Sequence, residues 1–485
     1  MRLGDDAHRR HRRGVPRPRH HPRRRLPDHR PRRAAACARH RDRGHREAPA
    51  DARRLARGRP GQRTGAVSSP ETEPTEASPV EAPPVALYVH VPFCVSQCPY
   101  CDFVVVAGRE ARGPTNRIDA FTAALETELR LRADALDARW GMPGSRPALA
   151  SVYFGGGTPS LLPVATVAGL IDLIRDRFGL AGGAEVTLEA NPGPDERGDP
   201  AALRDAGVTR LSIGAQSFDP DELRALGRRH TRADIAATVT GARSAGIPSV
   251  SLDLLYDIPG SSLRTWSRTV DAALRLEPDH LSLYALTLDD PDAEGLTGPT
   301  GDHLPLRPGA RRWREKARSG QDDDRAAAMY EIADRRLAAA GYEWYEISNW
   351  ARPGHQSRHN LAYWRRLPYE AVGPGAHAFD GATRRWNAAR LDTYLAALTP
   401  TERASPNPPP GGSERIDSGT AIAERAMLSL RTAEGLALAP AALARLATRL
   451  AAPVAAGLLD EAPNGRLTLT LRGRMLSNEV FARLV

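Results

Sequence analysis

The chain has 485 residues, enough for a large core and for more than one domain. It contains no run of 18 or more apolar residues and no secretory signal, so a cytoplasmic protein is expected, with peripheral membrane contact left open. Residues 1–66 hold 22 arginines and 6 acidic residues, a net charge of 22 − 6 = +16. The net charge of the whole chain is +10, so the remainder is net acidic. Nucleic acid is therefore not expected as a partner of the folded part.

Residues 1–84 have the composition of an Arg/Pro-rich disordered extension and linker, without hydrophobic periodicity. Two explanations are open for them. The segment is a basic arm that binds nucleic acid, or much of it is upstream sequence translated from a misplaced start codon, with the true start near Val67. The second is favoured because a single lysine, Lys316, stands among 68 basic residues, which is typical of GC-rich genomes with long spurious reading frames.

From residue 87 onward, short β-rich runs alternate with amphipathic helical stretches. The predicted strands are 87–91, 151–154, 185–189, 210–214, 249–255 and 280–286. The predicted helices between them are 119–136, 166–177, 199–206, 233–245 and 263–274. This alternation indicates parallel βαβ units and an α/β fold. Six units over 85–296 favour a partial (β/α)6 TIM-like barrel, although spacing alone leaves a doubly wound sheet open.

The rest of the chain divides by composition. Residues 297–323 are polar and are predicted to be an inserted loop, and 399–418 are predicted to be a linker. Between them, 324–398 complete the barrel with a helix at 326–340 and a strand-like run at 342–350. Residues 419–485 are predicted to form a small, mostly helical, winged-helix-like domain. Its expected helices are 421–430, 440–446 and 451–459, followed by a strand-like run at 466–471, and we expect a structural or partner-binding role.

Three of the four cysteines, Cys94, Cys98 and Cys101, lie within eight residues in a CxxxCxxC pattern. This clustering favours a metal site in a reducing compartment over disulfides. Three thiolates on one loop can hold three irons of a [4Fe–4S] cluster and leave the fourth iron open to a small molecule. Structural zinc is the alternative, but zinc sites usually have four ligands, and here the nearby imidazole is His90 alone, with no second cysteine pair.

Polar or glycine-rich segments accompany five successive predicted strands. The cysteine loop follows the first, and a Gly-Gly-Gly-Thr-Pro sequence at 155–159 follows the second. Glu189, Gln216 and Asp253 lie in or just after the next three. Each alone is more simply a surface group or a satisfied hydrogen-bonding residue. Because barrel active sites lie at the carboxyl ends of the strands, the five together predict one site.

The run 88–103 resembles the signature of the radical S-adenosylmethionine (SAM) enzymes, and within them the coproporphyrinogen-dehydrogenase-like branch. The glycine triplet, the contexts of Glu189 and Gln216, then Arg228 and Asp253, continue the similarity in order. The resemblance extends from about residue 87 to the carboxyl terminus and leaves residues 1–80 outside it.

The resemblance implies that the three cysteines ligate the cluster and that SAM binds its open iron. The residues implied around SAM are Tyr88 near the sulfonium, Tyr100 against the adenine, Gly156, Gly157 and Thr158 along the amino-acid end, and Glu189, Gln216, Arg228 and Asp253 at the remaining polar groups. In the catalytic members of the branch, reduction of the cluster cleaves SAM to a 5′-deoxyadenosyl radical, so an electron donor is an implied partner.

Two members of the branch compete. The oxygen-independent coproporphyrinogen III dehydrogenase carries a further cysteine two residues after the third, in a CxxxCxxCxC pattern. This chain has Phe103 there, as the HemW-type proteins do. HemW-type proteins are regarded as haem chaperones.

A second motif, HNxxYW at 359–364, matches the sequence associated with haem binding in HemW-like proteins. His359, Tyr363 and Trp364 are the haem residues that the resemblance implies, because imidazole is the usual axial ligand and flat aromatics suit a porphyrin. Nine aromatic residues fall within 342–386. Without the resemblance, His359 would be a hydrogen-bonded loop residue and the aromatics core. His377 is a second candidate.

The resemblance thus implies a haem chaperone of the radical SAM family. It would bind a [4Fe–4S] cluster, SAM and haem, and would pass haem to an acceptor protein. The alternative is a coproporphyrinogen III dehydrogenase, or another radical enzyme that acts on a tetrapyrrole. Whether the chain is an enzyme is left open, and dehydrogenase activity is not expected.

Overall fold

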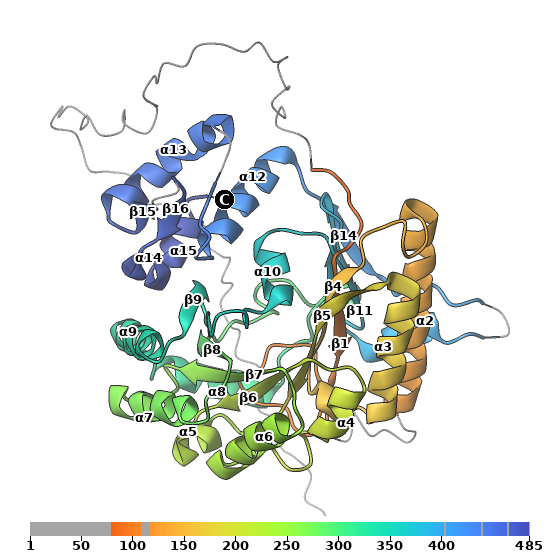
Figure 1. Ribbon diagram of the computed structural model, residues 1–485, viewed down its shortest axis with the longest axis horizontal. Coiled ribbons are helices and arrows are strands. Elements are labelled where there is room, and N and C mark those ends of the chain that lie inside the picture. Colours follow the sequence, from red (N-terminus) through yellow and green to blue (C-terminus); the bar gives the residue numbers. More distant parts are fainter. Residues whose placement is uncertain (1–78, 109–116, 402–403, 438–439, 463–464, 485) are drawn as a thin grey trace, which may run out of the picture. The chain divides into compact units, whose positions relative to one another are not determined.

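The computed structural model describes residues 79–108, 117–401, 404–437, 440–462 and 465–484 (Figure 1). The predictions for the amino-terminal extension and for a start near Val67 lie outside these residues. No helix in the described ranges is long and apolar enough to cross a membrane.

The centre of the fold is a run of six parallel strands that neighbour one another in chain order. They are β1 (Ala86–Val91), β4 (Leu149–Gly156), β5 (Leu180–Ala190), β6 (Arg210–Gln216), β7 (Ser249–Tyr256) and β8 (His280–Ala285). The main helices between them are α2 (Arg117–Trp140), α3 (Val164–Phe178), α4 (Pro200–Asp205), α5 (Pro220–Ala225), α6 (Arg232–Ser244) and α7 (Leu263–Leu274). They lie along one side of the sheet (Figure 1). The predicted α/β partial barrel is confirmed.

Side-chain alternation along the strands separates an apolar from a polar face. Leu87, Val89 and Val91 of β1 are fully buried in the core that also holds Phe121 of α2. The residues between them face the other way, because successive side chains of a strand point to opposite faces. The inner face of the barrel is consequently rich in hydroxyl, carboxylate and imidazole groups.

Further strands extend the sheet at both edges. Beyond β1 come β11 (Tyr369–Val372), which is parallel to it, and then antiparallel β12 (His377–Phe379), β13 (Thr383–Asn387) and β14 (Gly411–Arg415). Beyond β8 come β10 (Asn349–Ala351) and β9 (Glu343–Glu346).

The segment 399–418 is more than the predicted linker, because β14 pairs with β13 along its whole length. Two glycines make this pairing possible. A Cβ on Gly411 would lie 1.8 Å from the Trp386 carbonyl oxygen, and one on Gly412 would lie 2.2 Å from the Trp386 ring. The glycines that suggested a linker are thus needed for close strand packing.

The segment 297–323, predicted to be a loop, contains helix α8 (Pro308–Arg318). The polar composition of the segment suggested a solvated loop, but Arg314 is buried and bonds to backbone carbonyls instead of solvent. Ala317 and Trp313 pack against Ile258 and its neighbours beyond the ends of β7 and β8. The helix α9 (Asp323–Ala339) follows close to its predicted position.

The carboxyl-terminal part forms a second apolar core of its own. It contains α12 (Ser418–Leu430), α13 (Pro440–Ala455), β15 (Leu459–Glu461), β16 (Leu467–Leu469), α14 (Leu471–Met475) and α15 (Ser477–Phe481). The two helices expected over 440–459 are one helix that ends at Ala455, even though Pro453 lies inside its last turn.

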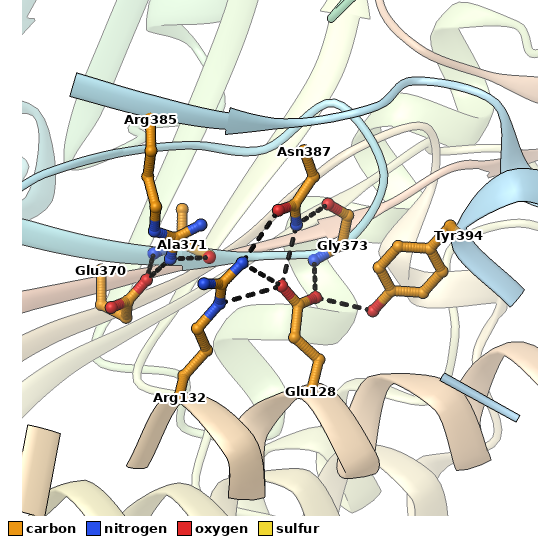
Figure 2. Close-up of polar contacts among 8 residues, drawn as sticks. All are labelled: Glu128, Arg132, Glu370, Ala371, Gly373, Arg385, Asn387 and Tyr394. Carbon is orange, nitrogen blue, oxygen red and sulfur yellow. Dashed lines mark hydrogen bonds and ion pairs between the residues drawn. The ribbon is translucent and has the colours of Figure 1, made fainter. Parts of the chain in front are cut away.

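A buried carboxylate ties helix α2 to the β11 edge of the sheet (Figure 2). Glu128 is fully buried and accepts hydrogen bonds from the Gly373 amide, Asn387 Nδ2 and the Tyr394 hydroxyl, each at 2.8 Å. Arg132, one turn further along α2, lies 3.2 Å from the same carboxylate. Several donors on one buried anion make this cluster stable only as a complete set.

Glu128→Ala should lower the free energy of unfolding by about 3 kcal/mol, because three buried donors and Arg132 lose their acceptor together. Glu126→Ala on the same helix is the matched control. Its pair with Arg130 is exposed, and its loss should cost less than about 1 kcal/mol. Chemical denaturation of the two variants measures the difference, and equal losses would contradict the structural role given to Glu128.

Candidate functional site

The three clustered cysteines lie on the loop that follows β1. Cys94 ends the short strand β2 (Phe93–Cys94), which pairs with β3 (Val106–Ala107) and so closes the loop at its base. All three thiols are half-buried and form no disulfide. Burial raises the pKa of Cys94 to about 11, so its thiolate needs a positively charged partner.

These thiols suit an iron–sulfur cluster better than a single ion. No group of three or more His, Cys, Asp or Glu side chains in the described ranges is placed to hold one metal ion. The ligands of a cubane cluster need not converge on one point, because each thiolate binds a different iron at a different corner. Soft sulfur donors on one half-exposed loop therefore fit the cluster that the sequence predicts.

A chain of hydrogen bonds joins two of the thiols through the ends of neighbouring strands. The Thr158 hydroxyl donates to Cys94 Sγ at 3.5 Å and accepts from Asn191 Nδ2 at 3.0 Å. Arg228 donates to Asn191 Oδ1, to the Gly214 carbonyl at 2.8 Å and to Cys98 Sγ at 3.7 Å. The predicted residues Thr158 and Arg228 are thus brought to the cysteines.

Asn191 was not among the predicted site residues. It directly follows β5, at the edge where the other polar residues gather, and this position is the signal that could have identified it. Gln216 completes the group, because a Cβ added to Gly214 would lie 3.0 Å from its side-chain nitrogen. Gln216 itself has a left-handed backbone with φ of 64°, which is rare for a residue with a side chain.

The glycine triplet packs directly against the base of the cysteine loop. The Gly157 and Thr158 amides donate to the Val91 and Phe93 carbonyls at 2.8 and 2.7 Å. A Cβ on Gly157 would lie 2.6 Å from the Phe93 oxygen, and one on Gly156 would lie 2.4 Å from the His90 ring. Close backbone approach therefore requires glycine here, and these amides are already bonded within the chain.

Two carboxylates lie on the inner face, on β5 and β7. Glu189 accepts from the Tyr153 hydroxyl at 2.8 Å and the Gly156 amide at 3.0 Å, and burial raises its pKa to about 7. Asp253 accepts from the Ser212 hydroxyl at 3.1 Å, and burial raises its pKa too. Glu189 thereby holds the glycine triplet in place, whether or not it also contacts a ligand.

The two predicted tyrosines are placed differently. Tyr100 packs into the cluster formed by Leu226, Leu255 and neighbouring residues, and its carbonyl accepts from Arg314 of α8 at 2.8 Å. Arg314 is a second residue that the sequence did not indicate. Tyr88 points inward from β1, and its hydroxyl lies 3.0 Å from His90 Nδ1.

The HNxxYW motif forms helix α10 (Arg358–Trp364), whose first residues pack against β4. His359 is buried with both ring nitrogens engaged. Nδ1 lies 3.0 Å from the Ser151 hydroxyl and Nε2 lies 2.8 Å from the Tyr363 hydroxyl, and burial lowers its pKa to about 3. That His359 binds haem stays a prediction, and in this conformation its imidazole holds the helix to the sheet.

A cavity of about 480 Å³ lies beside the end of the cysteine loop and helix α10. This volume is within the range of small-molecule and cofactor sites. Residues from both predicted motifs line it. Phe103, Tyr363 and Trp364 come from these motifs, and Arg366, His377 and Arg384 also line the cavity. Phe103 is 64% exposed, unusual for a large aromatic, and stands where the loop meets this cavity.

Gly156→Ala should destabilise the fold by about 1–3 kcal/mol, because the φ of 111° and the contact with His90 are both incompatible with a Cβ. Gly169→Ala is the matched control. It lies in helix α3 with no atom within 4 Å of the added Cβ, so it should stabilise by about 0.5–1 kcal/mol. Thermal or chemical unfolding gives both values, and shifts of the same sign would refute the close-approach argument.

Glu189 should make stability depend on pH. Its folded pKa of about 7 exceeds the ordinary glutamate pKa of 4.5, so the folded state holds a proton that the unfolded state releases between these values. Stability relative to Glu189→Gln should therefore fall as pH rises from 4.5 to 7, by up to about 1.4 kcal/mol per unit, and level off above. Denaturation of both proteins across this range tests it; a pH-independent difference would be inconsistent with a buried, proton-binding Glu189.

Comparison with known proteins supports one family. Residues 88–273 match the radical SAM superfamily. The chain is 40% identical over 408 residues to a Mycobacterium tuberculosis protein named heme chaperone HemW, covering 84% of this chain and 96% of that one. It is 36% identical over 298 residues to the Escherichia coli protein of that name, covering 61% and 71%. The E. coli coproporphyrinogen III oxidase HemN, described as a radical SAM enzyme, shares the fold, with a TM-score of 0.66, 22% identity and coverage of 84% and 91%. The chain belongs to the HemW family of the radical SAM superfamily.

Proposed function

We propose that this protein is a haem chaperone that holds a [4Fe–4S] cluster with SAM and passes haem to an acceptor protein. The relatives named heme chaperone HemW support this assignment. The observation that carries it is the placement of Phe103, an exposed aromatic side chain at the point where the cysteine loop meets the cavity.

Cys94, Cys98 and Cys101 would hold the cluster, and Arg228 and Thr158 would donate hydrogen bonds to its sulfur ligands. Such bonds stabilise thiolate charge and tune a cluster. When bound, the cluster supplies an electron to a ligand at its open iron. Glu189, Gln216, Asp253 and the 155–158 turn would surround SAM from the ends of the strands, with Tyr100 against its adenine.

Phe103 distinguishes the chaperone from the dehydrogenase. A cysteine at this position would give the loop a fourth soft donor, whereas phenylalanine gives a flat apolar surface that cannot bind iron. In this chain, that surface borders a cavity with further aromatic side chains, Tyr363 and Trp364. A porphyrin face suits such surroundings. The shared fold with HemN does not separate the two functions, because one fold hosts several chemistries.

The proposal implies two partners, an acceptor protein for haem and a donor of electrons to the cluster. The small carboxyl-terminal unit, with its own apolar core, is close to the cavity, because Glu424 and Met427 of α12 line it. A bound acceptor could therefore contact both the cavity and this unit.

Anaerobic reconstitution should yield about four iron atoms per chain, and each single Cys→Ala variant in the loop should lose the cluster. The reconstituted protein should bind haem and transfer it to apomyoglobin, a generic acceptor, as followed by visible absorbance. Supplied with coproporphyrinogen III, SAM and dithionite, it should form no protoporphyrinogen. Protoporphyrinogen formation would reject the chaperone assignment in favour of the dehydrogenase, and zinc in place of iron would reject the cluster.

A further inference from the structure

The lining of the cavity combines three chemical features. Aromatic side chains form one part, two arginines form a second, and an imidazole paired with a carboxylate forms a third. A ligand that suits all three is flat, apolar at its centre, anionic at one edge and able to bind imidazole through a metal. Haem has these properties, so this inference rests on the proposed function.

His377 presents a partly exposed imidazole in the lining of this cavity. Its side chain is 38% exposed and its ring stacks on Trp386, with centroids 6.0 Å apart and planes at 25°. Nε2 lies 2.6 Å from Asp302 Oδ2, and Nδ1 has no partner among the residues that the structure describes. A carboxylate on one ring nitrogen is the usual support of a metal-binding histidine, because it fixes the ring and raises its basicity.

Two of the other histidines nearby, His359 and His90, are less suited. Both nitrogens of His359 are bonded and the residue is 1% exposed. His90 is also buried, with Nδ1 bonded to Tyr88 and Nε2 2.8 Å from the Val104 carbonyl. His303 lies on the other side of Asp302, at 3.3 Å through Nδ1, and half-buried. It lines the same cavity and is therefore the proper comparison for His377.

The backbone that carries His377 is fixed by the buried carboxylate of helix α2 (Figure 2). Glu128 accepts from the Gly373 amide, and Asn387, bonded to the same carboxylate, donates from Nδ2 to the Gly373 carbonyl at 2.8 Å. The backbone amide of Asn387 donates to the Ala376 carbonyl, next to His377, at 3.0 Å. The imidazole therefore stands on a rigid turn, as a preorganised ligand should.

The two arginines supply the anionic edge. Arg366 and Arg384 both pair with Glu424, and Arg384 pairs with Glu414 as well. Arg366 is 7% exposed in its side chain, yet its Nη2 is buried without a hydrogen-bond partner among the described residues. A guanidinium nitrogen without a hydrogen-bond partner has donor capacity left for an acceptor. Carboxylates on one edge of a ligand would be acceptors for these two guanidinium groups.

We propose that haem binds in this cavity with His377 as the axial ligand of its iron, Asp302 as the residue that orients that ligand, and Arg366 and Arg384 at its propionates. Tyr363 and Trp364 of the HNxxYW motif line the cavity as walls. His359 acts through Tyr363, by holding helix α10 in place.

The test uses the full chain, reconstituted and titrated with ferrous haem b, followed by the Soret band and by the iron–imidazole stretch in resonance Raman spectra. His377→Gly should lose that stretch and bind haem at least about tenfold more weakly, and added imidazole should restore the signal. His303→Ala and His359→Gln should keep it. Asp302→Asn should keep the ligand but lower the stretching frequency, because the imidazole loses its anionic partner.

Persistence of the stretch in His377→Gly, or its loss in His303→Ala or His359→Gln with unchanged circular dichroism, would overturn the ligand assignment while haem binding itself stands. Failure of the unmodified chain to bind haem at all would instead reject the proposed function. These two failures are distinguishable in one titration series.

The propionate contacts have a separate test. Haem should bind the unmodified chain about tenfold more tightly than haem dimethyl ester, whose propionates carry no charge. Arg384→Ala should reduce that preference, whereas Arg358→Ala, on helix α10 but outside the cavity lining, should retain it. Equal binding of haem and its ester by the unmodified chain would show that the arginines do not meet the propionates.

Discussion

The candidate site depends on the close approach of the 155–158 turn to the base of the cysteine loop. Two amide hydrogen bonds from this turn to the chain around Val91 and Phe93 set the separation, and it is so short that only glycine fits at 156 and 157. The same contact brings the Thr158 hydroxyl to Cys94. From Thr158 the hydrogen bonds continue through Asn191 to Arg228 and Cys98, so the geometry of the thiols follows from backbone packing.

Much of this could be predicted from the sequence because it is encoded locally. The six central strands can be recognised as β-rich runs at regular spacing, and a parallel sheet places their carboxyl ends at one edge. Helix α8 and strand β14 could not be predicted in the same way. Arg314 donates to carbonyls of the distant cysteine loop, and Gly411 is required by its close approach to the Trp386 carbonyl, so only the tertiary contacts explain these residues.

The HNxxYW motif shows a different limit of prediction from sequence: the motif is easily recognised, but the roles of its residues are not. Its residues point to haem by resemblance, yet the motif does not say which member touches the ligand. In the structure, the histidine faces Ser151 and the sheet, whereas Tyr363 and Trp364 reach the cavity wall. A buried imidazole with two short hydrogen bonds gains little from iron unless the helix moves, since both bonds must break first. The half-exposed His377, already paired with a carboxylate, has no such cost.

The segment 101–107 connects the cysteine loop to the cavity, and this position makes Phe103 important for the proposed function. It begins at Cys101, borders the cavity at Phe103 and Val104, and returns to β3 beside Cys94. Val104 is held by His90, whose ring also sets the limit for Gly156. A cysteine at 103 would add an iron-binding donor to the segment that serves both regions. Phenylalanine instead gives this segment an apolar surface at the cavity, where the proposed haem would bind.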